Sequence, residues 1–310
     1  MTREDTPQLD IDRQSRRIGI VLLVIAAVLW SLNGGAVKLV DVPTIGYAFW
    51  RSFGAMLAGV GVVLATCGAG FRIATGPMLV AALFYSLQVT LLIFAMRLGT
   101  AAMGVLLLYT GPAWVALLGW LLLGRRISRK TATALGIAGL GVVIMIVGLG
   151  RSSPAGIACG LAAGLTYGAM ILALDWLART DALASPATIV FWLNLAAVAA
   201  LLPVGLATGK LLSPELSTLG NLATAVGLTL FGVVQLAVPY ALFQLALGRV
   251  TAVEASLIVL LEPVLNPMWA WLAVGEAPGW WTAAGGALLV VALVVEAVRF
   301  KRKASTTPVR

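Results

Sequence analysis

The sequence contains no histidine, only two cysteines and few charged residues, and each shortage excludes a class of protein. Without histidine the chain has no His-based zinc site and no Ser-His-Asp triad. Cys67 and Cys159 are too few and too far apart for a disulfide framework or a metal cluster, so we expect no metal and no cofactor. Charged residues make up 11% of the positions and hydrophobic residues 61%, which leaves too little polar surface for a soluble domain.

Long apolar runs fill most of the 310 residues, and the mean hydropathy is +1.02. About ten runs have roughly 20 residues each, enough to cross about 30 Å of hydrocarbon at 1.5 Å per helical residue. The expected spans lie near 18–38, 44–66, 77–97, 100–123, 131–149, 155–177, 187–208, 221–247, 251–274 and 279–299. The sequence therefore predicts an all-α membrane protein of ten transmembrane helices.

Basic residues are distributed unevenly between the two sides of this arrangement. Ten spans place both termini on one side, and 16 of the 21 Lys and Arg residues fall on that side. The remaining five are Lys38, Arg97, Arg151 and Lys210 on the other side, and Arg51 within a span. Cytoplasmic segments of membrane proteins carry the excess of Lys and Arg, so we expect both termini in the cytoplasm of a bacterial-type inner (plasma) membrane. The basic tails are then partners of membrane lipid and not of nucleic acid.

The two halves of the sequence repeat each other. The segment from Thr100 aligns with the segment from Thr251 at an offset of 151 residues. The coinciding pairs are Thr100/Thr251, Ala101/Ala252, Leu106/Leu257, Pro112/Pro263, Trp120/Trp271 and Gly124/Gly275. Phe49-Trp50 matches Phe191-Trp192, and Gly19-Ile20 matches Gly156-Ile157, at smaller offsets that increase in order along the chain. Loop insertions between duplicated helices produce such an order.

Each repeat has five spans, and five is an odd number. The second unit therefore enters the membrane from the opposite face, which predicts two inverted five-helix repeats related by a pseudo-twofold axis in the membrane plane. The expected organisation is a cytoplasmic tail over 1–17, repeats over 18–150 and 151–299, and a basic cytoplasmic tail over 300–310.

Three sequence features resemble those of a known family: the paired segment ends P...LLLGR and EPV...LAVGE, and the arginine of FWRSF. With the five-plus-five layout, they resemble the drug/metabolite transporter (DMT) superfamily, and within it the EamA-type ten-helix exporters. The resemblance implies efflux of amino acids, purines or drugs. The chain departs from the family pattern at Arg125, where the first repeat usually has an acid, and its counterpart in the second repeat is Glu276.

Arg51 and Glu262 are the charged residues placed deepest in the expected spans. A charge at the bilayer centre costs about 2.5–3.5 kcal/mol on insertion scales, so a charged residue there is expected to have a structural or functional role that offsets this cost. Counting helical rise, Arg51 lies about 10 Å and Glu262 about 13 Å below the outer surface, in one layer. They are expected either beside a substrate pathway, as a charge pair or with Glu262 as a proton-titratable acid, or in a structural ion pair that locks the second and ninth spans together.

Pro112 and Pro263 occupy matched positions near the middle of the fourth and ninth spans. Each lacks an amide donor and its ring clashes with the preceding turn, so each loosens the helix. The result is either a hinge or a static bend. Gly34 and Gly35 beside Asn33 can unwind the first span in the same way.

Aromatic and amide side chains within the spans are candidate ligand contacts. They are Trp30, Asn33, Trp50, Tyr85, Gln88, Tyr109, Trp192, Gln235 and Tyr240. Asn194 and Asn266 are further polar groups at similar depth. Apolar walls with a few polar groups suit a small amphipathic substrate, although each residue taken alone can equally be a packing residue.

Four glycines recur every fourth residue along the sixth span: Gly156, Gly160, Gly164 and Gly168. They form a smooth stripe on one helix face that permits close helix approach. The stripe can pack against another helix of the same chain, or it can form the contact between the two copies of a homodimer.

Three classes of function fit a chain of this kind. A secondary-active transporter working by alternating access comes first, because no P-loop is present to bind ATP. A membrane channel or a non-transporting scaffold is the second, although the apolar spans lack rings of charge. An intramembrane enzyme acting on a lipid-linked substrate is the third, and it lacks a cluster of acids or an activated nucleophile. We therefore expect a transporter and no enzyme.

Overall fold

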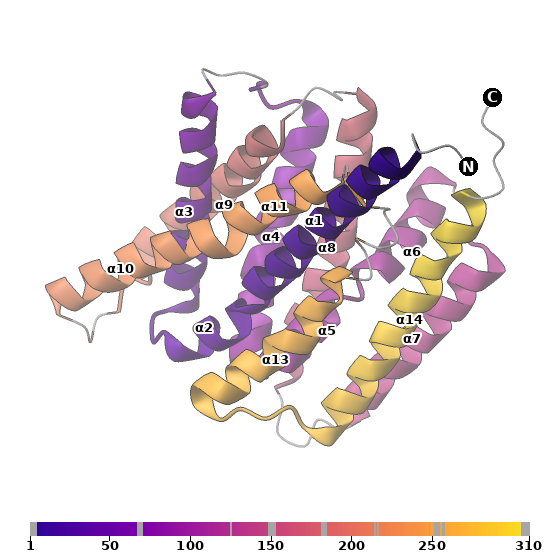
Figure 1. Ribbon diagram of the computed structural model, residues 1–310. Helices are drawn as coiled ribbons and strands as arrows, with labels where there is room; N and C mark the ends of the chain where they lie inside the picture. The colour runs from indigo at the N-terminus through magenta and orange to yellow at the C-terminus, as the bar shows by residue number, and fades with distance from the viewer. Residues whose placement is uncertain are drawn as a thin grey trace.

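A computed structural model describes residues 5–66, 71–124, 126–147, 153–180, 185–213, 215, 217–247, 249–250, 255 and 258–304. This part of the chain is helical and contains no strand (Figure 1). The helices are α1 Asp5–Ser31, α2 Asn33–Leu39, α3 Thr44–Ala65, α4 Gly76–Leu98, α5 Ala101–Leu108, α6 Gly111–Leu123, α7 Arg129–Val147, α8 Pro154–Thr180, α9 Pro186–Thr208, α10 Thr218–Gly232, the π-helix η1 Val233–Ala237, α11 Val238–Leu247, α13 Leu261–Val274 and α14 Trp280–Ala304.

The helices account for all ten expected spans. Among the described residues, seven helical segments are long and apolar enough to cross a membrane, if α1–α2, α5–α6 and α10–α11 are each counted as one. Two shorter apolar segments, Thr131–Val147 and Trp280–Val295, and the 14-residue α13 supply the other three. The prediction of an all-α membrane protein with ten transmembrane helices is confirmed.

Contacts between the two halves are arranged in mirrored pairs. α1 packs along α11 as α8 packs along α4, and α3 contacts α10 and η1 as α9 contacts α4. α13 lies against α1 and α2 just as the corresponding α5 and α6 lie against α8. The pairs α3–α9 and α7–α14 join equivalent helices of the two halves, and the pair α5–α13 joins the equivalent fourth and ninth spans. The halves are therefore two inverted five-helix repeats that pack on each other through the same set of interfaces.

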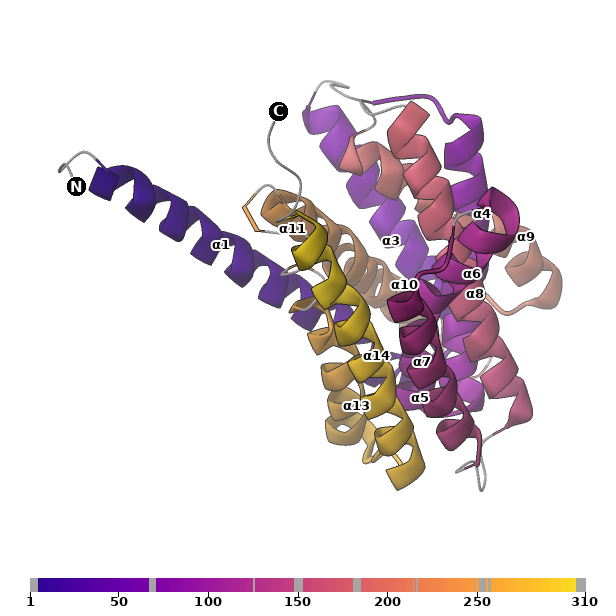
Figure 2. The ribbon, with the colours of Figure 1, turned by 90° about the vertical axis from the view of Figure 1, so that its right-hand side faces the viewer.

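Helical structure extends past the membrane spans at both ends of the chain. α1 begins at Asp5, ahead of the expected span, and α14 continues to Ala304. α1 begins and α14 ends at the same end of the bundle, which we call the termini end (Figure 1). Figure 2 shows the first turns of α1 projecting away from the other helices. Charged residues mark where a span leaves the hydrocarbon, whereas backbone hydrogen bonds continue the helix into water.

Glycines allow the central helices to cross without side chains between them. A Cβ at Gly54 would meet the backbone of Thr229, and a Cβ at Gly232 would meet the carbonyl of Arg51. The close crossing of α3 with α10 and η1 places Arg51 next to Gln235. Glycine at these positions therefore decides which polar side chains meet in the core.

The glycine stripe of α8 lies inside the molecule. Added Cβ atoms at Gly160, Gly164 and Gly168 would meet residues of the α5–α6 segment, among them Leu107 and Trp114. The stripe is thus used for packing within one chain, which allows α8 to approach the interrupted α5–α6 segment closely.

Three spans are interrupted close to the middle of the bundle. The first span breaks at Leu32, between α1 and α2, and the fourth breaks at Tyr109 and Thr110. The ninth span is interrupted by a turn at Leu260, directly before α13. Leu260 corresponds to Tyr109 at the offset of 151 residues. Pro112 and Pro263 each fall within the first turn after their break, where a missing amide donor is tolerated. The two breaks thus lie two and three residues before these prolines.

Candidate functional site

A cavity of about 200 Å³ lies at the meeting point of the two halves. Of the residues that the sequence singled out, it is lined by Trp30, Asn33, Arg51, Tyr85, Gln88, Tyr109, Gln235, Tyr240 and Glu262. These residues come from α1, α2, α3, α4, η1, α11, α13 and the break between α5 and α6. Both repeats, and every interrupted span, therefore contribute to its walls.

Arg51 is the buried cation of this cavity, with 2% of its surface exposed. Its Nη1 donates to Asn33 Oδ1 at 2.8 Å and to Gln235 Oε1 at 3.1 Å. Tyr47 Oη also donates to Asn33 Oδ1, at 3.0 Å. Arg51 Nε is buried without a hydrogen-bond partner. No described carboxylate lies within ion-pair distance of Arg51, so neutral oxygens and the ring of Tyr47, 5.8 Å from the guanidinium carbon, stabilise its charge.

Glu262 is the partly buried acid of the cavity, at the second position of α13. Its Oε2 accepts a hydrogen bond of 2.8 Å from Tyr109 Oη. Tyr109 lies at the break of the fourth span and Glu262 directly after the matching break of the ninth. Arg51 and Glu262 thus share a cavity, as expected from their depth, but each has neutral partners, and the alternative of a direct ion pair is not realised.

Amide side chains take up the carbonyls that the break in the first span leaves free. Gln235 Nε2 donates to the Trp30 carbonyl at 3.0 Å, and Asn266 Nδ2 donates to the Ser31 carbonyl at 3.2 Å. Gln235 belongs to the π-helical turn η1, a form of helix that often marks functional sites. Asn266 Oδ1 is buried without a donor. The unwound backbone of the first span is therefore held by the second repeat.

Aromatic side chains form much of the remaining wall. Trp30 contacts Tyr240 edge-on, with ring centroids 5.3 Å apart, and Phe243 at 5.7 Å. Tyr85 Oη donates to Asn194 Oδ1 at 3.0 Å. Such a wall offers apolar surface and few free polar groups, which concentrates the polar recognition at Arg51 and Glu262.

Trp50 and Trp192, also candidates from the sequence, do not line this cavity. Trp50 Nε1 of α3 donates to the Leu211 carbonyl at 3.0 Å, and Trp192 Nε1 of α9 donates to the Arg72 carbonyl at 2.9 Å. Each indole thus bonds the loop that follows the partner helix of the other repeat. The two matched tryptophans fasten α3 and α9 together at opposite ends.

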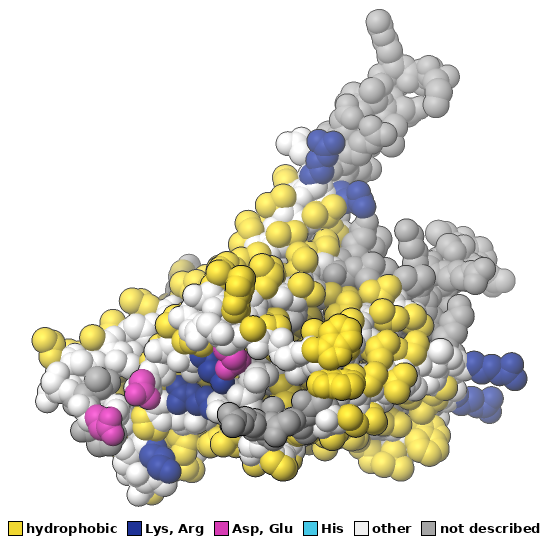
Figure 3. Space-filling model, turned by 90° about the horizontal axis from the view of Figure 1, so that it is seen from below, with side chains coloured by type: hydrophobic (Ala, Val, Ile, Leu, Met, Phe, Trp, Pro, Cys, Tyr) yellow, Lys and Arg dark blue, Asp and Glu magenta, His cyan; other side chains and the backbone are white. Residues whose placement is uncertain are grey.

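The end of the bundle opposite the termini end is held by an ion pair. Lys38 Nζ of α2 lies 2.7 Å from Glu276 Oε2, just after α13, and donates to the Gly99 carbonyl at 3.0 Å. Glu276 Oε1 accepts the amide of Ala101 at the start of α5, at 2.7 Å. We call these contacts the Lys38–Glu276 clasp. Figure 3 shows this end, with acidic and basic side chains side by side among apolar ones. Arg125, the sequence counterpart of Glu276, lies outside the described residues.

Tyr47, Tyr167 and the clasp were not foreseen from the sequence. Tyr47 bonds Asn33, and Tyr167 of α8 lines the cavity. A tyrosine within an apolar run gives no signal that separates it from a packing residue. Lys38 and Glu276 lie near span ends, where charged side chains are ordinary.

Comparison with known proteins places the chain in a family. A model of the EamA-like transporter family matches residues 17–147 and again residues 154–296. The chain belongs to the EamA-like transporter family. An uncharacterized transporter of Archaeoglobus fulgidus is 30% identical over 279 residues, which cover 90% of this chain and 96% of the relative. A solved crystal structure superposes with a TM-score of 0.60 at 19% identity, over 92% of this transporter and 98% of that chain, and supports the fold alone.

Proposed function

We propose that this transporter is a secondary-active exporter of a small amphipathic metabolite, an amino acid or a closely similar molecule. The central cavity is the substrate site, and the two inverted repeats expose it to each side of the membrane in turn. Export as the direction rests on the resemblance to EamA-type exporters. We place the transporter in a bacterial-type inner membrane with both termini in the cytoplasm.

The separated charges of the cavity carry this proposal. Arg51 has neutral partners and a buried Nε with no acceptor, while Glu262 has a single described donor, Tyr109. Charges held this way in a membrane gain most from a ligand of opposite charge. A molecule with a carboxylate near Arg51 and an ammonium group near Glu262 satisfies both, and its apolar part fits against the ring of Phe243.

The size of the cavity favours a metabolite over a drug. Its volume of about 200 Å³ is smaller than the roughly 300–1,000 Å³ of sites that hold drug-sized ligands. The aromatic rings of Trp30 and Tyr240 contact each other and limit the length of an apolar substituent.

Glu262 is the proposed site of proton coupling. Coupled export requires a cavity group that exchanges a proton, and Glu262 is the one carboxyl among the lining residues. Protonation of Glu262 on one side of the membrane releases the ammonium group of the substrate, and deprotonation on the other side allows the next molecule to bind. The family model and the relative favour a transporter over an enzyme.

Transport by reconstituted protein tests the proposal. We would measure flux of amino acids, nucleobases and a cationic dye into liposomes, with and without a pH gradient. We expect flux of small amino acids that is accelerated severalfold by the gradient, and little flux of the dye. The Glu262→Gln variant should fold normally, because its amide oxygen still accepts from Tyr109, but its flux should no longer respond to the gradient.

Glu215→Gln is the matched control, since Glu215 is an exposed acid away from the cavity. It should keep the response to the pH gradient. Absence of flux for every amino acid would refute the substrate class, and gradient-insensitive flux by the unaltered protein would refute coupling through Glu262. Passive conductance of small ions would favour a channel instead.

A further inference from the structure

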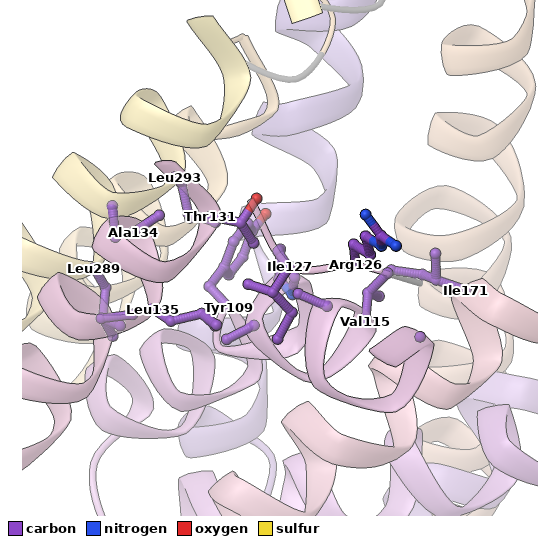
Figure 4. A pocket seen from close by; sticks show the side chains of 16 residues that line it. Tyr109, Val115, Arg126, Ile127, Thr131, Ala134, Leu135, Ile171, Leu289 and Leu293 are labelled. Atoms are coloured by element: carbon purple, nitrogen blue, oxygen red, sulfur yellow. The ribbon is translucent and has the colours of Figure 1, made fainter. Parts of the chain in front are cut away.

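A second cavity of about 510 Å³ lies apart from the polar centre, between α6, the start of α7 and α14. Figure 4 shows Leu289 and Leu293 of α14 on one side, Val115 and Ile171 on the other, and Tyr109, Ile127 and Thr131 between them. The cavity is larger than the central one, and its walls come from both repeats. We call it the lateral groove.

The groove exists because the α7–α14 pair stands partly away from the other helices. The two helices cross tightly where Gly141 and Gly285 meet, since a Cβ on either glycine would contact the carbonyl of the other. Their main contacts with the rest of the bundle are those of α14 with α5 and of α7 with α6. Small residues of α6, Ala113, Ala116 and Gly119, leave the remaining space open.

The lining of the groove is apolar apart from three side chains. Tyr109, Thr131 and Arg126 are its polar members. Arg126 is exposed at the termini end, and Arg129 is exposed three residues further on. A small zwitterion gains little from such walls, whereas a hydrocarbon chain that carries an anion at one end matches both the apolar lining and the cation.

The length of the groove matches one leaflet of a bilayer. α6 runs from Gly111 to Leu123, about 18 Å at 1.5 Å per residue, and Arg126 follows it. Half of a hydrocarbon core measures about 15 Å. With a phosphate at Arg126 in the headgroup layer, an acyl chain reaches Tyr109 near the midplane. Basic sites between transmembrane helices bind anionic lipid headgroups in this way.

We propose that the lateral groove binds one acyl chain of an anionic phospholipid, with its phosphate at Arg126 and the end of the chain against Tyr109. Tyr109 borders both cavities and donates to Glu262. The bound lipid therefore contacts the residue that donates a hydrogen bond to Glu262. Anionic lipid should raise both the stability of the protein and its rate of transport.

Lipid-dependent stability of the purified full-length protein tests this site. We would add phosphatidylglycerol or phosphatidylcholine with identical acyl chains to the protein in detergent, and follow the unfolding temperature and the lipid retained in native mass spectra. Phosphatidylglycerol should be retained preferentially by the unaltered protein. Arg126→Gln should lower that preference about fivefold, the effect of one basic residue near the headgroup layer. Ala116→Trp fills the groove and should abolish retention of both lipids.

Two variants serve as matched controls. Arg179→Gln removes an exposed cation that pairs with Asp175, and Leu122→Trp adds an indole on the exposed face of α6 outside the groove. Both should behave as the unaltered protein. Equal retention of the two lipids by the unaltered protein, or normal retention by folded Ala116→Trp, would overturn the proposal.

Photo-crosslinking of the unaltered protein gives a reading that does not depend on any variant. Phosphatidylglycerol with a photoreactive group at the end of one acyl chain should label α6, α7 and α14 near Tyr109, and an excess of unlabelled phosphatidylglycerol should suppress that labelling. Labelling spread evenly over the lipid-exposed helices would refute the site, and so would suppression by an amino acid in place of the lipid.

Discussion

Arg51 is the residue on which the central cavity depends most. Its burial among neutral oxygens leaves a positive charge whose desolvation is only partly offset. We expect Arg51→Gln to raise the KM for carboxylate-bearing substrates at least tenfold, because the loss of a charge-assisted hydrogen bond costs about 1.5–3 kcal/mol. Flux at several substrate concentrations measures the change.

Arg51→Lys is the informative companion of that variant. A lysine keeps the charge but cannot donate in two directions from a planar group, so KM should rise less than in Arg51→Gln. If both variants reduced the amount of folded protein and left KM unchanged, Arg51 would be a purely structural residue.

At the scale of single residues, the sequence predicted much of the cavity because the membrane restricts where polar side chains point. Arg51, Gln235 and Glu262 lie in apolar spans, and a polar group there must face the protein interior. Trp50 was wrongly expected to line the cavity. Its long indole side chain reaches away from the cavity and donates a hydrogen bond to a loop carbonyl. The sequence did not predict that Arg51 and Glu262 bind separate partners. Helical rise gives the depth of a residue in the membrane but not the direction of its side chain.

The interrupted helices raise the question of motion at the scale of elements. Pro112 prevents the fourth span from continuing, since its ring would clash with the carbonyl four residues earlier. We expect Pro112→Ala or Pro263→Ala to let the helix straighten and to slow transport severalfold without loss of folding. Pro203, inside the unbroken α9, is the control, and Pro203→Ala should leave the rate unchanged. Unaltered rates in all three variants would favour a static bend over a hinge.

The crossing of α3 with the eighth span gives a second test at this scale. Gly232→Ala places a Cβ against the backbone of Arg51, and overpacking of this kind costs about 1–3 kcal/mol. Gly227 lies on the same helix with open space around it. Gly227→Ala should be neutral or stabilise by up to about 1 kcal/mol. Chemical denaturation in micelles compares the two free energies of unfolding, and equal values would contradict the crossing.

The sequence foretold some helix breaks and not others. Proline marks the break near Tyr109 and Leu260, and the glycines next to Asn33 mark the one in the first span. Pro239 follows the π-helical turn, and its ring excludes the regular hydrogen bond to the Gln235 carbonyl, but a proline alone does not predict that the helix adopts a π turn there. Proline and glycine therefore predict where a helix is interrupted, whereas the way one helix packs against another cannot be predicted from these residues alone.

The Lys38–Glu276 clasp acts on the whole molecule, since it joins α2, α5 and the segment after α13 at one end. Both side chains are largely buried, at 16% and 22% exposure. We expect a coupling of about 1 kcal/mol or more between Lys38→Met and Glu276→Gln in a double-mutant cycle of unfolding free energies. The exposed pair Arg179–Asp175 should give about 0.3–0.5 kcal/mol. A coupling near zero for the clasp would mean that it does not hold this end closed.

The orientation of the molecule is open to a direct test. Cysteines introduced at Lys210 and Arg72 of a variant lacking Cys67 and Cys159 should react with membrane-impermeant reagents from opposite sides. We expect position 210 to react in intact cells and position 72 in inside-out vesicles. The reverse pattern would invert the proposed topology and with it the direction of export.

The mirrored packing of the helices has a consequence for the origin of such a molecule. Most interfaces between the repeats occur twice as mirrored pairs, and others join a helix to its own counterpart. A gene half as long, whose product entered the lipid in both directions, would already supply all of these interfaces from two identical chains. In a fused chain each copy is free to specialise, so that Arg51 and Glu262 each need to arise only once.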